Sequence, residues 1–375
     1  MRVLLTGARG LPALVAARQL HRAGHAVLVC DTFPTHATRH SREIERSFQV
    51  PAPRFEEEAF IQRLLSIIEE HRVDVLMPTG EEILYVARHS ERLKALCEVV
   101  AATFEQLTAL HDKGAFNQRV AALGLPAPKT WRLEGQEHLE TLLLEHSRLI
   151  VKPAFSRFGQ KTRLVQAGTP LPPLGFTRTL LAQEFIEGTE LCSSSVVWEG
   201  ALTAHVCYRP RYRFPSGPGY YYEPLGHPGV REWVLRFLEG TRFTGSLGFD
   251  FIETDRGELF ALECNPRMTS GFILFPEDGR LGRAMLGQAI AEPDLETPAM
   301  VGFPMLTAAL LRIRSWQGLR EWRRAFGAAR DAFWRREDPK PFWYQLAAFP
   351  HLFQLSRRHG LAMGEATTHY TEWNG

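Results

Sequence analysis

The chain contains the stretch GFDFIETDRGELFALECNPRMTSG at residues 248–271, and its pattern predicts a β-hairpin. Strands are expected over residues 249–254 and 259–265, joined by a turn at Asp255-Arg256-Gly257. Glycine in that turn supplies the positive φ angle that tight hairpin turns use. The two strands therefore form a local ladder, and its register decides which side chains meet.

The register of this hairpin decides whether its acidic side chains converge. Successive side chains of a strand point to opposite faces, so Ala261, Glu263 and Asn265 are expected on one face. A two-residue loop, Arg256-Gly257, would place Asp250 directly opposite Glu263 on that face. A three-residue loop would shift the register by one and separate the two carboxylates.

Two adjacent carboxylates repel each other unless one is protonated or a cation holds both. Mg²⁺ prefers oxygen ligands and often shares them with substrate phosphates. Asp250, Glu263 and Asn265 are therefore candidate metal ligands, and the alternative is an edge hairpin with solvated acids. Arg267 and the small residues after it, in the segment PRMTSG, favour a phosphate site over that alternative.

Whole-chain composition indicates a soluble globular protein. The 375 residues are too many for one ordinary core, so two or three domains are expected. A net charge of +2 gives no reason to expect nucleic acid as a partner. Five widely spaced cysteines argue against a disulfide framework or a zinc site. With no signal peptide and no transmembrane segment in the sequence, a cytoplasmic location is expected.

The N-terminal region has a βαβ pattern. A strand at residues 3–6, a glycine-rich turn at 7–10, a helix at 12–22 and a strand at 26–30 are expected. A dinucleotide could bind such a turn, but unrelated domains also begin this way. After the next buried strand, at residues 73–77, Glu81 either faces a substrate amine or simply starts a helix.

The middle of the chain carries a basic loop. A strand at residues 149–153 includes Lys152, and the loop at 154–161 carries Ser156, Gly159 and Lys161. Such a loop can fold over a nucleotide phosphate, and the alternative is an ordinary basic loop. Further on, alternation predicts that Arg209, Arg211 and Arg213 share one face, which either binds an anion or is a solvated basic edge.

The C-terminal region is rich in Trp and Arg, and its segment PFWYQLAAFPHLFQL, at residues 341–355, is aromatic and apolar. This segment could lie on a membrane surface or at a dimer contact. Internal packing is the more usual fate of such a segment.

Taken in order, these features resemble the ATP-grasp superfamily, in particular relatives of the carbamoyl-phosphate synthetase large subunit and of D-alanine–D-alanine ligase. The resemblance covers residues 1 to about 290. It implies an α/β fold with a Rossmann-like pre-ATP-grasp domain at residues 1–108 and a small ATP-grasp subdomain at 109–186. A metal-binding subdomain would follow at 187–290, and a helical extension at 291–375.

The resemblance rests on short motifs in the family's order. Glu263, Asn265 and Arg267 match its Glu-x-Asn-Pro-Arg signature, and Asp250 stands where related ligases place their first metal acid. The two lysines that contact ATP phosphates match Lys113 and Lys152. Gln183, in place of a common Glu, begins the matching hinge segment. The implied ATP-binding residues are Lys113, Lys152, Ser156, Gly159, Lys161, Gln183, Glu184, Phe185, Ile186 and the ribose-binding Glu190.

The activity implied by the resemblance is an ATP-dependent carboxylate–amine ligase that works through an acylphosphate and releases ADP and phosphate. Mg²⁺, as two ions, with Mn²⁺ as a substitute, would be held by Asp250, Glu263 and Asn265, and Arg267 would stabilise the transferring phosphoryl group. A small carboxylic acid and an amine are the implied partners, and a homodimer stays open. Glu81, Arg209, Arg211 and Arg213 are the candidate substrate residues.

Three alternatives remain. One is a carboxylase of the biotin-carboxylase or carbamoyl-phosphate type, and another is an inactive nucleotide-binding protein. The third is a nicotinamide-dependent oxidoreductase, suggested by the N-terminal glycines. Against the third, no lysine of the chain has a tyrosine four residues before it, so the Tyr-x-x-x-Lys pair of the short-chain enzymes is missing.

Overall fold

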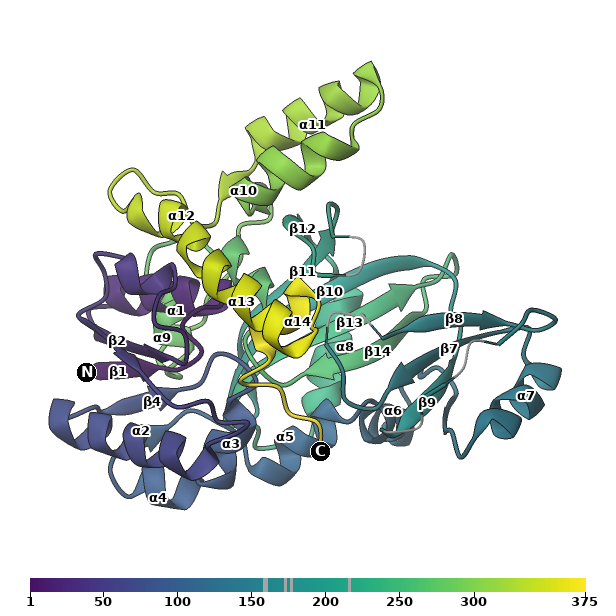
Figure 1. Cartoon of the computed structure of the whole chain (residues 1–375), viewed down its shortest axis with the longest axis horizontal. Helices are drawn as coiled ribbons and strands as arrows, with labels where there is room; N and C mark the ends of the chain where they lie inside the picture. The colour runs from purple at the N-terminus through teal and green to yellow at the C-terminus, as the bar shows by residue number, and fades with distance from the viewer. Residues whose placement is uncertain (158–160, 172–173, 176–177, 215–216) are drawn as a thin grey trace.

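The computed structural model describes residues 1–157, 161–171, 174–175, 178–214 and 217–375. Its mixed α/β architecture has three sheets, of five, four and seven strands in the described residues (Figure 1). The predicted α/β class is confirmed. The predicted division of the chain near residues 108, 186 and 290 stays a prediction.

The N-terminal sheet is parallel, with strand order β3-β2-β1-β4-β5. Apolar residues cover both of its faces, as expected when βαβ units place helices on each side. One face packs on α1 and the other on α2. The elements are β1 Arg2–Leu5, α1 Leu11–Arg22, β2 Ala26–Asp31, β3 Arg46–Gln49, α2 Glu57–His71, β4 Val75–Met77, α3 Ile83–Arg88, α4 Ser90–Lys94, β5 Glu98–Val99 and α5 Phe104–His111.

The second sheet is antiparallel, with strand order β6-β9-β7-β8. Leucines of α7 cover one face, where Leu139 and Leu142 pack with Leu149 and Val151. The elements of this region are α6 Lys113–Ala122, β6 Thr130–Arg132, α7 Gln136–Glu145, β7 Arg148–Pro153, β8 Arg163–Gln166 and β9 Leu180–Glu184.

The third sheet has strand order β14-β13-β10-β11-β12-β15-β16. Aromatic residues of α8 pack on one face, where Trp233 and Phe237 contact Phe249. The opposite face carries Asp250. The strands and helix are β10 Thr189–Trp198, β11 Ala201–Pro210, β12 Tyr221–Leu225, α8 Pro228–Leu238, β13 Gly245–Glu253, β14 Leu259–Asn265, β15 Ala299–Met300 and β16 Arg330–Asp331.

The hairpin of β13 and β14 forms, and of the two loop lengths that the sequence left open, the structure has the three-residue loop. Glu253 pairs with Leu259, and the Thr254 amide donates to the carbonyl of Glu258, so residues 255–257 make the loop. That register alone would separate the two acids. A β-bulge between Asp250 and Phe251 restores the pairing of the two acids, because one extra residue, Leu262, enters the β14 side of the ladder. Asp250 is therefore opposite Glu263 after all.

The bulge also breaks the predicted alternation along β14. Ala261 was expected to share a face with Glu263 and Asn265. It is instead buried in the hydrophobic core with Leu259 and Cys264, on the α8 side of the sheet. The extra residue shifts the side-chain parity by one, so the two halves of β14 follow opposite patterns.

The sequence predicted a helical extension after residue 291. The structure differs, because β15 and β16 of this region extend the third sheet. Its helices are α10 Gly302–Pro304, α11 Trp316–Ala328, α12 Lys340–Tyr344, α13 Phe349–His359 and α14 Met363–Thr368, and α9 Arg280–Ala284 precedes them. The aromatic segment at 341–355 is packed internally only in part. Leu352 and Leu355 are buried against Phe33, whereas Trp343 and Phe353 are more than half exposed.

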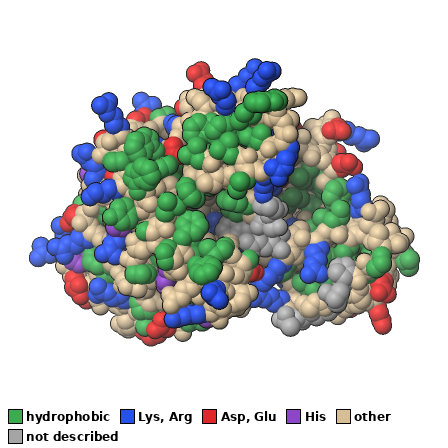
Figure 2. All heavy atoms as spheres, turned by 45° about the horizontal axis from the view of Figure 1, so that its top comes forward, with side chains coloured by type: hydrophobic (Ala, Val, Ile, Leu, Met, Phe, Trp, Pro, Cys, Tyr) green, Lys and Arg blue, Asp and Glu red, His purple; other side chains and the backbone are tan. Residues whose placement is uncertain are grey.

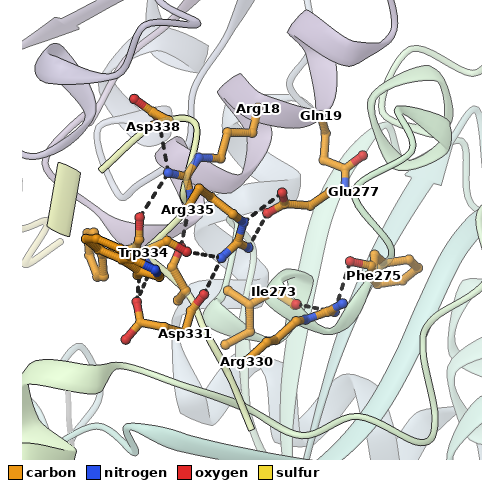
Figure 3. Close-up of polar contacts among 12 residues, drawn as sticks. Arg18, Gln19, Ile273, Phe275, Glu277, Arg330, Asp331, Trp334, Arg335 and Asp338 are labelled. Atoms are coloured by element: carbon orange, nitrogen blue, oxygen red, sulfur yellow. Dashed lines mark hydrogen bonds and ion pairs between the residues drawn. The ribbon is translucent and has the colours of Figure 1, made fainter. Parts of the chain in front are cut away.

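An arginine network anchors this region to the rest of the molecule (Figure 3). The buried Arg18 of α1 donates to the carbonyls of Ala332 and Phe333 and pairs with Asp338 at 3.1 Å. Arg335 pairs with Glu277, and Arg330 donates to the carbonyl of Phe275 at 3.0 Å. Guanidinium groups with several fixed acceptors, one buried and two half-buried, hold residues 330–338 in one position. Within the described residues, no helix is long and apolar enough to cross a membrane.

Candidate active site

The predicted metal ligands come together on the face of the third sheet that lies away from α8. Asp250 of β13 and Glu263 of β14 are register partners, and Asn265 Nδ2 donates to Asp250 Oδ2 at 3.4 Å. Arg267 Nη2 donates to Asn265 Oδ1 at 2.9 Å, so this cation borders the cluster as expected. Two carboxylates, one amide and one guanidinium thus occupy a single place.

The pKa values of the two acids are shifted in opposite directions. Burial and, after it, the adjacent charge of Glu263 together raise the pKa of Asp250 to about 8. Burial also works to raise the pKa of Glu263, but Lys113 and Lys152 outweigh it and lower that pKa to about 2. The pair therefore holds one negative charge and one proton near neutral pH, and a divalent cation could take the place of that proton.

The donor set fits a cation that brings further ligands with it. Among the described residues there is no group of three or more His, Cys, Asp and Glu side chains able to hold a metal alone. Mg²⁺ is commonly bound by one or two carboxylates and completed by substrate phosphates and water. The cluster of Asp250, Glu263 and Asn265 matches that second arrangement.

Lys113, from α6, reaches this cluster as the first residue of its helix. The side chain of Asp112 caps α6 by accepting from the amides of Gly114 and Ala115, which fixes the start of the helix. Lys113 Nζ lies 3.3 Å from Glu263 Oε2 and donates to the carbonyl of Ser156 at 3.0 Å. The Lys113 ammonium therefore connects the carboxylate of Glu263 to the basic loop.

Lys152, from β7, reaches the cluster from the second sheet. Its Nζ donates to Gln183 Oε1 at 2.8 Å and to the carbonyl of Leu262, the bulge residue, at 3.3 Å. Burial lowers its pKa to about 8. Gln183 is held in turn by its donation to Thr130 Oγ1 at 3.0 Å. The side chain of Gln183 thus positions Lys152.

The remaining hinge residues lie at and just after the end of β9. Glu184 accepts from the amide of Lys129, and the Arg148 guanidinium lies 4.4 Å from the centre of the Phe185 ring. Ile186 is half-buried. Glu190, at the start of β10, pairs with Arg213 at 2.6 Å. The acid expected to bind ribose therefore already has a cationic partner.

The three predicted arginines follow one antiparallel ladder that continues past the end of β11. Arg209 lies opposite Glu223, the Arg211 amide donates to the Tyr221 carbonyl at 3.1 Å, and Arg213 forms an antiparallel bridge with Gly219, so strand alternation extends to all three arginines. Arg211 pairs with Glu223 at 3.0 Å, and Arg213 pairs with Glu190, while Arg209 is exposed. The predicted common face is therefore supported, and two of its three cations already have carboxylate partners. Their role in binding a substrate stays a prediction.

Glu81 lies at the centre of a buried cluster of polar contacts that the sequence analysis did not predict. His111 Nε2 lies 2.5 Å from one of its oxygens, and Arg157 of the basic loop forms an ion pair with the other. The amide of Trp373 donates to the same carboxylate at 3.3 Å. Burial raises the pKa of Glu81, but Arg157 and His111 outweigh it and lower the pKa to about 2. The carboxylate is therefore ionised and held by three segments far apart in sequence.

The basic loop faces the C-terminal residues. Lys161 Nζ lies 3.7 Å from Glu365 of α14, and Gly159 falls outside the described residues. Arg178 Nη1 donates to Asn374 Oδ1 at 2.9 Å. A cavity of about 90 Å³ lies between this loop and the segment around α14, with Arg54 and His369 in its wall. No sequence motif indicated these contacts.

The glycine-rich turn of the N-terminal domain is filled by the protein itself. A Cβ at Gly7 would lie 2.5 Å from Glu82 Oε1, and the Glu82 carboxylate accepts from the amides of Thr79 and Gly80. Asp31, at the end of β2, accepts from the amide of Arg9 at 2.8 Å. The groups that a dinucleotide would need are thus engaged, which counts against the nicotinamide alternative.

No protein-family model and no curated protein sequence matches the chain. Solved structures do. N5-carboxyaminoimidazole synthetase from Staphylococcus aureus, complexed with ADP, has a TM-score of 0.64 and 14% identity over 90% of this chain and 91% of that one. L-amino acid ligase from Bacillus licheniformis has a TM-score of 0.59 and 15% identity over 76% and 74%.

A third similar structure is the biotin carboxylase domain of 2-oxoglutarate carboxylase from Hydrogenobacter thermophilus, in complex with MgADP, ADP and bicarbonate. Its TM-score is 0.60, with 14% identity over 77% of this chain and 70% of that one. All three proteins are members of the ATP-grasp superfamily. The chain therefore has the ATP-grasp fold, as its motifs had indicated.

Proposed function

We propose that this protein is an ATP-dependent carboxylate–amine ligase that works through an acylphosphate. One observation carries the proposal. Lys152 of the second sheet and Lys113 of α6 meet the Asp250–Glu263 pair of the third sheet at one place. Cations that can hold phosphate oxygens and oxygens that can hold Mg²⁺ are thus adjacent, which is what phosphoryl transfer from ATP requires.

In this proposal Asp250, Glu263 and Asn265 hold Mg²⁺, as two ions or with Mn²⁺ as a substitute. The metal, when bound with ATP, neutralises the charge of the phosphates during transfer. The raised pKa of Asp250 supports the assignment, because the pair cannot carry two charges without a cation. ADP and MgADP in the similar structures are consistent with this nucleotide chemistry.

The side chains and backbone of the protein position ATP and stabilise the charge that develops during phosphoryl transfer. Lys113 and Lys152 orient the phosphates, while Ser156, Gly159 and Lys161 cover them. Backbone groups of the hinge, Gln183, Glu184, Phe185 and Ile186, bind adenine. Glu190 binds ribose once its ion pair with Arg213 is broken. Arg267 stabilises the negative charge on the transferring phosphoryl group. Glu81 is not assigned to the amine, because His111 and Arg157 already engage its buried carboxylate.

The reaction needs no side-chain nucleophile. A carboxylate oxygen of the substrate attacks the γ-phosphorus, and the bond from that phosphorus to the bridging oxygen of ADP breaks. The nitrogen lone pair of the amine then attacks the acyl carbon. Phosphate leaves with its bonding electron pair, and the amine proton passes to phosphate or water. The products are an amide, ADP and phosphate.

ATP-dependent carboxylation is the second candidate. It is favoured by the similarity to a biotin carboxylase domain that was crystallised with bicarbonate. Bicarbonate would then take the place of the carboxylic acid, and carboxyphosphate would take the place of the acylphosphate. An inactive nucleotide-binding protein is disfavoured, because the two lysines and both acids are all present and adjacent.

The decisive experiment measures ADP and phosphate with the purified protein, ATP and Mg²⁺. Panels of carboxylic acids and amines are compared with bicarbonate alone, and the product is identified by mass. Phosphate release that requires both an acid and an amine supports the ligase. Release with bicarbonate in place of the acid supports the carboxylase. AMP and pyrophosphate as products would reject both reactions.

A further inference from the structure

A helical hairpin at residues 302–328 projects from the third sheet (Figure 1). Its first arm runs from α10 through a helical turn to Arg312, and its second arm is α11. The inner sides of the arms pack together, and Trp322 Nε1 donates to the carbonyl of Met305 at 3.0 Å. Its base is fixed where Arg330 donates to the carbonyl of Phe275. The hairpin is therefore a rigid arm with a defined tip.

The tip of this arm presents apolar side chains to solvent. Leu311 is 75% exposed and Trp316 is 80% exposed, although both belong to residue types that are usually buried. Trp343, Phe349 and Phe353 of α12 and α13 are also exposed. Figure 2 turns this side of the molecule toward the reader, and hydrophobic side chains gather on it with Lys and Arg at the edges. Such gathered exposure marks an interaction surface.

The same region concentrates positive charge. Residues 301–360 hold ten Arg and one Lys against four acidic residues, a net charge of +7 in a chain whose total is +2. Trp316, Arg320 and Arg324 are spaced by four residues on the exposed face of α11. Among the described residues, no carboxylate lies within 4.0 Å of a nitrogen of Arg314, Arg320 or Arg324. These cations are available to an external anion.

We propose that the hairpin tip binds the surface of an anionic lipid bilayer. Leu311 and Trp316 enter the headgroup region, and Arg314, Arg320 and Arg324 contact lipid phosphates. An apolar tip bordered by arginines is the composition of interfacial membrane-binding helices. A second copy of the chain fits less well, because a twofold contact would oppose two tips that carry the same positive charge. Nucleic acid would use the arginines but offers no apolar region for Leu311.

Binding at the tip would place the nucleotide cleft next to the bilayer. Arg312 Nη1 donates to the carbonyl of Arg213 at 2.8 Å, and Arg213 holds Glu190. Only two residue contacts therefore separate the tip from the residue assigned to ribose binding.

The test is co-sedimentation of the full chain with vesicles of phosphatidylcholine alone or mixed with phosphatidylglycerol. The chain is expected to sediment with the anionic vesicles, and added salt should weaken the binding. The double variant Leu311→Ser/Trp316→Ser should bind at least about tenfold more weakly. Each of Arg314→Gln, Arg320→Gln and Arg324→Gln should weaken binding about fivefold. ATP turnover without vesicles should be unchanged in all of them.

Leu144→Ser is the matched control, since Leu144 is 87% exposed on α7, outside the hairpin. It should bind vesicles like the unmodified chain. Absence of binding to anionic vesicles, or an equal loss in Leu144→Ser, would overturn the proposal. So would a dimer in solution that Leu311→Ser/Trp316→Ser dissociates. Binding of a DNA duplex that depends on the arginines but not on Leu311 and Trp316 would assign the surface to nucleic acid instead.

Discussion

Asp250 lies opposite Glu263 because Leu262 is an extra residue in the β14 ladder. The three-residue loop and the bulge each shift the register by one, and together they restore the pairing of the two acids. The carbonyl of Leu262 also accepts from Lys152 at 3.3 Å. The bulge therefore aligns the two carboxylates and at the same time directs a backbone acceptor at Lys152.

Removing the Glu263 carboxylate should abolish most turnover. Glu263→Gln keeps the shape of the side chain but loses the charge that Lys113 and the metal require. ATP turnover should fall by about 10²-fold or more, a typical loss when a charge-stabilising group is removed. Release of ADP measures the effect. Glu258→Gln, on the exposed part of the same hairpin, is the control and should retain activity. Full activity in Glu263→Gln would refute the metal assignment.

The pKa of Asp250 predicts a pH dependence of stability. Its folded pKa of about 8 exceeds the ordinary value of 3.8, so the native state binds the proton more tightly than the unfolded chain. The free energy of unfolding of the metal-free protein should therefore fall as pH rises from about 4 to about 8. Asp250→Asn should remove this part of the slope and gain on the order of 5 kcal/mol at pH 8. Urea unfolding in EDTA measures it, and identical slopes in both proteins would contradict the prediction.

Gln183 should set the pH range over which ATP binds. Burial lowers the pKa of Lys152 to about 8, so its ammonium is lost as pH rises through that value. The KM for ATP should rise above about pH 8. A carboxylate in place of the Gln183 amide favours the charged lysine, so Gln183→Glu should move that rise to higher pH. Gln166→Glu, at an exposed position of β8, serves as the control. An unchanged pH profile in Gln183→Glu would exclude this role.

Trp373 should be required for stability although it is the third residue from the end of the sequence given. Its ring packs against Tyr85 and Phe104 and lies under the Arg88 guanidinium. Trp373→Ala should cost about 3 kcal/mol of the free energy of unfolding, as for other buried aromatic residues. Trp316→Ala removes an exposed ring and should change that free energy little. Equal values for the two variants in urea unfolding would show that Trp373 does not hold the segment in place.

Much of the architecture was predictable because its signals are local. Apolar strands followed by glycine turns and amphipathic helices indicated the parallel sheet, and the turn at Gly257 indicated the hairpin. The order of Lys113, Lys152, Asp250 and Glu263 indicated one site, since each occupies a position in a short motif. The loop length was left open and the face of Ala261 was mispredicted, because a bulge depends on packing on both faces of the sheet and leaves no local pattern.

The sequence by itself determined which chemical groups are available: two acids and an amide in one hairpin, and two lysines among the only six of the chain. These follow from residue types and short spacings. The tertiary structure alone decided what Glu81 contacts, because His111, Arg157 and Trp373 lie 30, 76 and 292 positions away. It also decided that Leu311 and Trp316 face solvent. An apolar residue carries the same signal in a core and on a surface, and only the packing of the whole chain separates the two.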